Sequence, residues 1–170
     1  MATPGSPAHA SPSGCPRYEP PHVTAAENPS IHASAVLVGH QAVLIRGPSG
    51  SGKSRLAFDL ILAGRAGQLP AATLIGDDRV RLTVSDGRLA VRGMEELAGK
   101  LEIRGLGIRT TEAAAEGIIG LVVDLGAADA ERLPPPWALI TTISEVKVPR
   151  IPVAAGHAPL PLVLAFLTTT

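Results

Sequence analysis

Short apolar runs separated by polar or glycine-containing turns recur along most of the chain, and this pattern predicts many short strands. The runs at 35–38 and 42–45 are separated by three turn residues and predict a β-hairpin whose second strand enters a glycine-rich loop. The runs at 80–84 and 89–91 flank a Ser-Asp-Gly turn and predict a second hairpin. Further strands are predicted at 72–75, 118–123 and 138–143.

Helical spacing is clearest at 54–66, where apolar residues stand at positions 56, 57, 60, 61 and 63. A second apolar segment, 160–167, predicts a buried strand or helix. The intervening stretch 125–136 is polar, ends in prolines and predicts a connection. Strands therefore dominate the predicted elements, and helices are few.

The first 28 residues are rich in Ala, Pro, Ser and Gly and have no apolar period. Such a segment buries too little apolar surface to offset its ordering entropy, so we predict a flexible tail at 1–28. Cys15 and His22 lie in this tail and are assigned no role. The pattern changes near Ile31, and we assign 29–170 to one folded domain of ordinary size.

Composition narrows the classes of partner. Fifteen basic residues balance fifteen acidic ones and only four aromatics are present, which argues against a nucleic-acid partner. No apolar segment reaches the roughly 18 residues that cross a bilayer, so no membrane partner is predicted. The N-terminus lacks a signal-peptide pattern, and the lone Cys15 cannot form an internal disulfide; both favour a cytoplasmic location.

The most specific motif is the loop Gly47-Pro48-Ser49-Gly50-Ser51-Gly52-Lys53-Ser54, which matches the Walker A pattern at every required position. Its glycines allow backbone N–H groups to surround a phosphate where a Cβ would obstruct. Lys53 is placed to bridge the β- and γ-phosphates, and the Ser54 hydroxyl is a Mg²⁺ ligand. A strand before the loop and a helix after it support the match. We therefore predict binding of a nucleoside triphosphate with Mg²⁺.

Two aspartates, Asp77 and Asp78, follow the predicted strand at 72–75. In phosphate-loop folds an acidic residue at such a strand end meets Mg²⁺ or its waters. Neighbouring residues on a strand point to opposite faces, so one aspartate is predicted to face the metal and the other to act as a general base. The alternative is a structural turn in which Asp78 pairs with Arg79 or Arg81.

A third polar segment is Leu101-Glu102-Ile103-Arg104-Gly105-Leu106-Gly107-Ile108. It places a carboxylate and a guanidinium two residues apart on a short strand that opens into a glycine turn. Glu102 is a candidate metal ligand and Arg104 a candidate phosphate clamp. The alternative is a surface ion pair beside a turn.

Taken in order, these segments resemble the C-terminal catalytic domain of HPr kinase/phosphorylase, from about residue 31 to residue 159. Ile31-His32-Ala33, the phosphate loop and Gly76-Asp77-Asp78-Arg79-Val80 carry the resemblance, and 101–108 is similar to the signature of the family. The resemblance implies an α/β phosphate-loop kinase domain, rich in strands and related to phosphoenolpyruvate carboxykinases. It also implies ATP and Mg²⁺ as cofactors and a hexameric assembly.

The resemblance also implies roles for individual residues. Lys53 would be a catalytic phosphate ligand, Asp78 the acceptor of the proton from the target serine, and His32 an active-site histidine. Ser54 and Glu102 would hold the metal, with Asp77 as a further metal candidate. An arginine in a family turn after the central strand is matched loosely by Arg132, and Arg104 and Gly105 belong to the signature. His40 matches no family position and is assigned to the surface.

Departures from the family pattern bear on whether the kinase and phosphorylase activities are both predicted. The N-terminal domain of the family has no counterpart here, and this short form resembles those of alphaproteobacteria. Arg55 stands where the family has an acid, and His157 replaces an arginine in a loop tied to dephosphorylation. Kinase activity is therefore predicted, and reverse phosphorylase activity is not.

The predicted function is ATP- and Mg²⁺-dependent phosphorylation of a serine on an HPr-like phosphocarrier protein, in regulation of a carbohydrate or nitrogen phosphotransferase system. Two alternatives stay open at this point. One is a small-molecule kinase, which needs an acceptor pocket and a lid. The other is a non-catalytic ATP-binding regulator.

Overall fold

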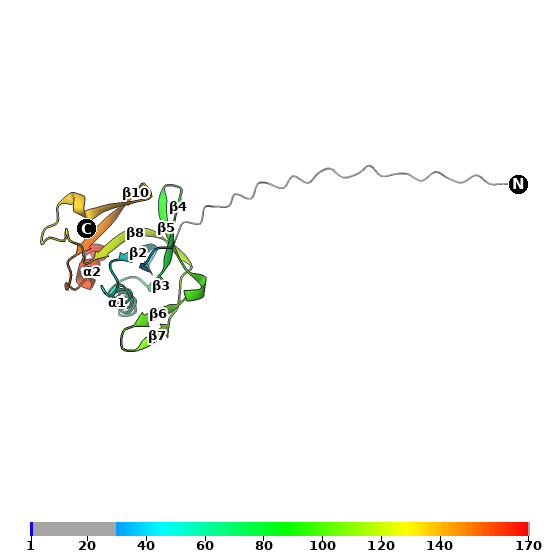
Figure 1. The fold of residues 1–170 in the computed structure, drawn as a ribbon, viewed down its shortest axis with the longest axis horizontal. Helices are drawn as coiled ribbons and strands as arrows, with labels where there is room; N and C mark the ends of the chain where they lie inside the picture. The colour runs from blue at the N-terminus through cyan, green and yellow to red at the C-terminus, as the bar shows by residue number, and fades with distance from the viewer. Residues whose placement is uncertain (2–29, 170) are drawn as a thin grey trace.

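The computed structural model describes Met1 and residues 30–169, and the predicted tail at 1–28 lies almost entirely outside these described residues. Within them the chain forms a mixed eight-stranded sheet, a separate two-stranded hairpin and two α-helices (Figure 1). The elements in chain order are β1 (Ser34–Val38), β2 (Gln41–Arg46), α1 (Lys53–Arg65), β3 (Ala72–Gly76), β4 (Val80–Ser85), β5 (Arg88–Gly93), η1 (Glu95–Leu97), β6 (Lys100–Ile103), β7 (Gly107–Thr110), β8 (Glu116–Leu125), η2 (Pro136–Leu139), β9 (Ile140–Ile143), β10 (Val146–Val153) and α2 (Leu160–Thr168).

Strand order in the large sheet is β3-β1-β2-β8-β10-β9, and the β4–β5 hairpin joins it where β5 pairs with β8. β2 and β10 run parallel to β8, while β1 is antiparallel to both β2 and β3. Strands β2, β3, β8 and β10 therefore share one direction, and their carboxyl ends lie at the same edge of the sheet. Ligand sites in open α/β sheets form at this edge.

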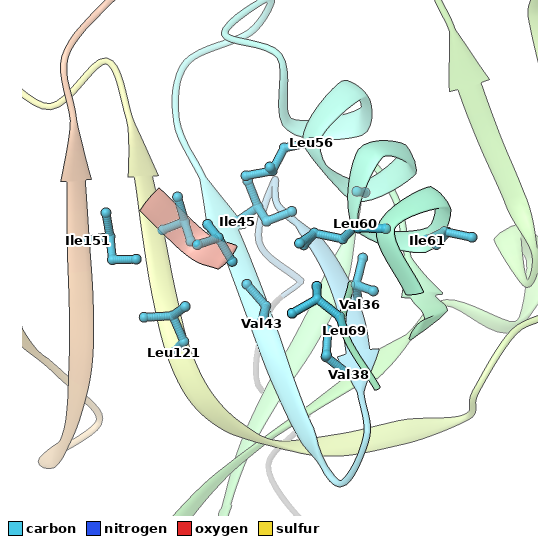
Figure 2. Packing of buried hydrophobic residues seen from close by; sticks show 14 of the residues in the cluster. Val36, Val38, Val43, Ile45, Leu56, Leu60, Ile61, Leu69, Leu121 and Ile151 are labelled. Carbon is cyan, nitrogen blue, oxygen red and sulfur yellow. The ribbon is translucent and has the colours of Figure 1, made fainter. Parts of the chain in front are cut away.

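Side chains alternate between two apolar layers on opposite faces of the sheet. On β2, Val43 and Ile45 point toward α1, where Leu56 and Leu60 pack against them (Figure 2). Leu44 points to the other face, which the β4–β5 hairpin covers. Full burial of each of these side chains stabilises the fold by about 1.5–3 kcal/mol. The central segments 42–45 of β2 and 121–123 of β8 are buried on both faces and contain only apolar residues.

The two predicted hairpins, the helix after the glycine loop and the strands at 72–75 and 118–123 are confirmed. The predicted strand at 138–143 is wrong in its first two residues, because Pro136 begins the short 3₁₀ helix η2 and the strand starts only at Ile140.

Strand β10 has no counterpart among the predicted elements, because its prolines, Pro149 and Pro152, argue against a strand inside a sheet. The pairing explains how they are tolerated. Val146–Pro149 pairs with β9 and Arg150–Val153 pairs with β8, so each half of β10 has a ladder partner on one side only.

The C-terminal segment is the helix α2, and its predicted burial holds on one face only, where Leu160, Leu164 and Leu167 pack against the core. Pro161 lies in the first turn, where a missing N–H costs no helical hydrogen bond. Val163 is the one buried residue of this helix, whereas Leu162 and Phe166 on its outer side are more than 40% exposed.

Two glycines bring the ends of β3 and β5 together beneath the site described below. A Cβ placed on Gly93 would lie 2.1 Å from the carbonyl oxygen of Ile75, and one placed on Gly76 would lie 3.0 Å from the Cα of Gly93. The backbone approach therefore requires glycine at position 93, immediately beside the strand end that leads to Asp77.

Candidate active site

Four segments line a cavity of about 460 Å³ at the carboxyl edge of the sheet. The phosphate loop and the start of α1 form one wall, the turn after β3 a second and the end of β6 a third, and His32, two residues before β1, completes the lining. Its lining residues are His32, Ser49, Gly50, Gly52, Lys53, Ser54, Arg55, Asp77, Asp78, Glu102, Ile103 and Arg104. The cavity thus gathers most of the predicted site residues from distant parts of the chain.

The phosphate loop has the backbone geometry expected for anion binding. Gly47, Gly50 and Gly52 all have positive φ, at 149°, 77° and 98°. No side chain caps the amino end of α1, so its first-turn N–H groups are available to a bound anion. The Ser51 hydroxyl is buried and has no hydrogen-bond partner within residues 30–169. The residues present fit a phosphate group, because they offer N–H and O–H donors in a cradle that side chains would fill.

Lys53 is only 6% exposed, and its ammonium donates to the carbonyl oxygens of Gly47 and Pro48 at 3.0 and 3.1 Å. An ammonium group has three donors, so one remains for a phosphate oxygen. Among the described residues, the buried polar or charged side chains are those of Ser34, Lys53 and Asp77. Burial of ionisable groups is costly and is concentrated at functional sites. The burial of Lys53 and Asp77 therefore supports this cavity as the candidate functional site.

Asp77 connects three elements through its carboxylate. Its Oδ1 accepts hydrogen bonds from the hydroxyl of Ser34 at 2.5 Å and that of Ser54 at 3.0 Å, and its Oδ2 accepts from the backbone N–H of Glu102 at 3.4 Å. All three donors are neutral, so they orient the carboxylate without cancelling its charge. A buried carboxylate beside a serine hydroxyl is an oxygen donor set that fits Mg²⁺.

Asp78 differs from Asp77 in exposure and backbone. Its φ is +68°, in the left-handed region that non-glycine residues seldom adopt, and its side chain is 68% exposed. His32 Nε2 lies 3.1 Å from Asp78 Oδ1. The predicted separation of the two aspartates therefore takes the form of one buried and one exposed carboxylate in the same cavity. Arg79 donates to the hydroxyl of Ser30, and the alternative of a structural turn at Asp78 stays open.

The end of β6 contributes Glu102 and Arg104 to the cavity wall. Arg104 follows the last strand residue, so it belongs to the turn between β6 and β7 and not to the strand as predicted. A Cβ placed on Gly50 would lie 3.7 Å from the Nη2 of Arg104, which places the guanidinium against the phosphate loop. This position favours the phosphate-clamp interpretation of Arg104.

Gly47, Pro48 and Ser51 of the phosphate loop are not among the lining residues, and two predicted residues outside the loop, Gly105 and Arg132, lie away from the cavity lining as well. Gly105 is in the β6–β7 turn with φ +83°, where it supplies the backbone conformation of the turn. Arg132 is exposed in the connection after β8. The start of that connection lies beside the phosphate loop in space, because a Cβ placed on Gly47 would lie 2.7 Å from the carbonyl oxygen of Leu125. The assignment of Arg132 stays a prediction. His40 is exposed in the β1–β2 turn, as predicted.

A second charged cluster beside the phosphate loop went undetected in the sequence. Arg46, the last residue of β2, makes a bidentate pair with Asp124 on β8, with both distances 2.7 Å. Arg150 on β10 donates to Asp124 at 2.6 Å, to Asp129 at 2.6 and 3.0 Å, and to the carbonyl oxygen of Ala138 at 3.0 Å. The one signal in the sequence is that Arg46 and Asp124 each end an apolar run.

The pKa values of this cluster follow from its hydrogen bonds. Partial burial acts to raise the pKa of Asp124, but the hydrogen bonds and charges of Arg46 and Arg150 outweigh it and hold the pKa below 3.8. The hydrogen bond from Arg150 lowers the pKa of Asp129 as well, and the same bond raises the pKa of Arg150. These shifts all favour the ionised forms of Asp124, Asp129 and Arg150.

Residues 23–165 match the family model of the HPr Serine kinase C-terminal domain. The chain belongs to this family. The match covers the phosphate loop, both aspartates and the segment 101–108, so the family resemblance of the sequence is confirmed.

Relatives agree with this assignment. The chain is 31% identical over 141 residues, 75% of its length, to the HPr kinase/phosphorylase of Mycoplasma mycoides subsp. mycoides, of which the match covers 43%. It is 40% identical over 84 residues to that of Streptococcus thermophilus, covering 49% of the chain and 25% of the relative. The chain thus spans less than half the length of these curated relatives.

The structure of the Hpr(Ser) kinase/phosphatase from Coxiella burnetii is also similar, with a TM-score of 0.65 and 25% sequence identity. The superposition covers 82% of this chain and 93% of that one. The predicted strand-rich α/β fold is confirmed. Within the described residues no helix is long and apolar enough to span a membrane.

Proposed function

We propose that this domain is an ATP- and Mg²⁺-dependent protein serine kinase that phosphorylates an HPr-like phosphocarrier protein and acts in the cytoplasm, where ATP is available. The observation that carries the proposal is the meeting of the phosphate loop, Asp77, Asp78 and Glu102 around one cavity. Membership of the HPr kinase family supplies the acceptor class, because the relatives are named for action on HPr.

The donor side of the reaction is a matter of position and charge. The loop amides and Lys53 bind the phosphates of ATP, and Ser54 with Asp77 would hold Mg²⁺, with Glu102 as a further ligand. When bound, Mg²⁺ supplies charge neutralisation for the phosphate oxygens. Arg104 lies against the loop and is positioned to contact a phosphate from the other wall. These groups fix the γ-phosphate for in-line attack.

The acceptor side depends on Asp78. Its carboxylate takes the proton of the serine hydroxyl as the serine oxygen bonds to the γ-phosphorus and the bond to the bridging oxygen breaks, releasing ADP. His32 contacts Asp78 and holds its carboxylate toward the cavity. The exposure of Asp78 at the cavity supports this role, because the carboxylate is open to an incoming serine. Arg132 is a further candidate for the developing charge.

Reverse phosphorylase activity is not part of the proposal. His157, which stands in place of the family arginine, is exposed in the loop between β10 and α2. A hexamer is what the family resemblance implies, and light scattering in solution tests it.

The central test is Asp78→Asn with an HPr-like protein and labelled ATP. We expect transfer to slow by about 10²-fold or more, the scale of a positioned base, while ATP binding is nearly unchanged. Asp86→Asn is a matched control, because Asp86 is also an exposed turn aspartate with positive φ, at 51°, but lies outside the cavity lining. Full activity of Asp78→Asn would show that the base assignment is wrong.

Wild-type protein distinguishes the other functions. Transfer to metabolites but not to the phosphocarrier would identify a small-molecule kinase. Tight ATP binding without a phosphoserine on any phosphocarrier, measured by mass spectrometry, would identify a non-catalytic regulator. Lys53→Ala should abolish transfer in either kinase.

A further inference from the structure

The segment 126–139, defined here as the β8–β9 connection, lies against the phosphate loop but contributes no residue to the cavity lining. It follows Leu125, the last residue of β8, whose carbonyl oxygen would lie 2.7 Å from a Cβ placed on Gly47. A Cβ placed on Gly126 would lie 3.7 Å from Pro48. The connection carries Arg132 and ends at η2, which contains Trp137. The position of the connection relative to the phosphate loop therefore decides where Arg132 lies relative to a bound phosphate.

Hydrogen bonds to one side chain hold the two ends of this connection. Arg150 binds the carboxylate of Asp129 through two nitrogens and also binds the carbonyl oxygen of Ala138. A backbone bond from Ala127 to Val153 adds a third attachment to the same strand. A single guanidinium thus bridges residues that are nine positions apart in the connection.

Arg150 is itself fixed at its other nitrogen by Asp124, which also pairs with Arg46, the residue directly before the phosphate loop. The Arg150 side chain is only 14% exposed, so its geometry is set by packing as well as by charge. Bidentate arginine–carboxylate pairs are geometrically specific, and lysine cannot reproduce them. The arrangement links the loop-bearing strand, the central strand and the connection in one chain of contacts.

We propose that Arg150 and Asp129 are positioning residues that hold the β8–β9 connection beside the phosphate loop in the geometry that phosphoryl transfer requires. This inference rests on the proposed kinase function. The two residues touch neither nucleotide nor acceptor in this scheme and act through the connection. Disorder of a positioning segment lowers kcat more than it lowers nucleotide affinity, because the phosphate loop itself stays intact.

Asp129→Ala is the informative variant, because it removes the carboxylate attachment of the connection while Arg150 keeps Asp124 and the carbonyl oxygen of Ala138. We expect kcat for transfer to an HPr-like protein to fall about 10- to 100-fold, the scale of a small misplacement, with the KM for ATP changed less than about twofold. Asp129→Glu, which restores the carboxylate, should recover most of the rate. Glu116→Ala is the matched control, because it removes a carboxylate from the exposed ion pair with Arg92 and should leave kcat unchanged.

The sequence contains a single tryptophan, Trp137, and it adjoins Ala138 in the connection. Its fluorescence anisotropy therefore reports on the connection without requiring activity. We expect the anisotropy to fall in Asp129→Ala and to return in Asp129→Glu, with an unchanged thermal midpoint. Unchanged kcat and anisotropy in folded Asp129→Ala would overturn the inference, and so would an equal rise in the KM for ATP. Absence of transfer by wild-type protein would refute the kinase proposal instead, and the anisotropy would still test the attachment.

Discussion

Two carboxylates lie at the carboxyl edge of the same sheet and are held in opposite ways. Asp77, after β3, accepts hydrogen bonds from two serine hydroxyls and a backbone N–H. Asp124, on β8, accepts from two guanidinium groups. β8 is the parallel neighbour of the loop-bearing strand, yet it is the more distant β3 that provides the acid beside Ser54.

The comparison shows that the charge of the hydrogen-bond donors decides whether a carboxylate keeps negative charge for a cation. Neutral donors orient Asp77 and leave its negative charge for a cation, whereas Arg46 and Arg150 compensate the charge of Asp124 completely. A residue type and a strand end are thus insufficient to identify a metal ligand. The partners must be known as well.

Protein stability should separate the two carboxylates most strongly. Asp124→Asn leaves the partly buried guanidinium of Arg46 without its counter-charge and leaves Arg150 with Asp129 alone, and we expect the free energy of unfolding to fall by about 2–3 kcal/mol. Asp77→Asn keeps an oxygen for the serine hydroxyls and should change it by less than about 1 kcal/mol. Urea unfolding in the absence of Mg²⁺ measures both. Equal losses in the two variants would contradict the distinction.

The Mg²⁺ requirement for phosphate transfer should change more in Asp77→Asn than in Asp124→Asn. Asp77→Asn should raise the Mg²⁺ concentration that gives half-maximal phosphate transfer by about tenfold or more, since it removes the negative charge beside Ser54. Asp124→Asn should leave this concentration unchanged in the folded fraction. A magnesium titration of the initial rate at saturating ATP checks the prediction, and a shift in both variants would refute it.

The smallest expected effect is on acid stability. The pKa of Asp124 lies below 3.8 in the folded protein, so folding favours the ionised carboxylate. The stability that this provides is complete above pH 3.8 and is lost as pH falls through the lower folded pKa. The difference in unfolding free energy between wild type and Asp124→Asn should therefore shrink below pH 3.8. A difference that grows there would reverse the assigned sign.

The sequence was sufficient for the phosphate loop and for the elements around it, because glycine spacing and apolar periodicity are local signals. It also placed Asp77 and Asp78 at a strand end. It could not reveal that Asp77 is the buried partner of Ser34, because that contact spans 43 residues. The Arg150 contacts escaped prediction for a related reason, since β10 contains two prolines and was not expected to be a strand at all.

The contact between Gly76 and Gly93 has a consequence for how this domain tolerates sequence change. A single methyl group at position 93 would collide with the Ile75 carbonyl, two residues before Asp77, although it lies on the far hairpin of the sheet. The position of the Asp77 carboxylate thus depends on the absence of a side chain at position 93, which adjoins Ile75 and Gly76 in space but is distant from them in the sequence. Substitution of Gly93 at the end of the β4–β5 hairpin is therefore restricted by the backbone next to Asp77.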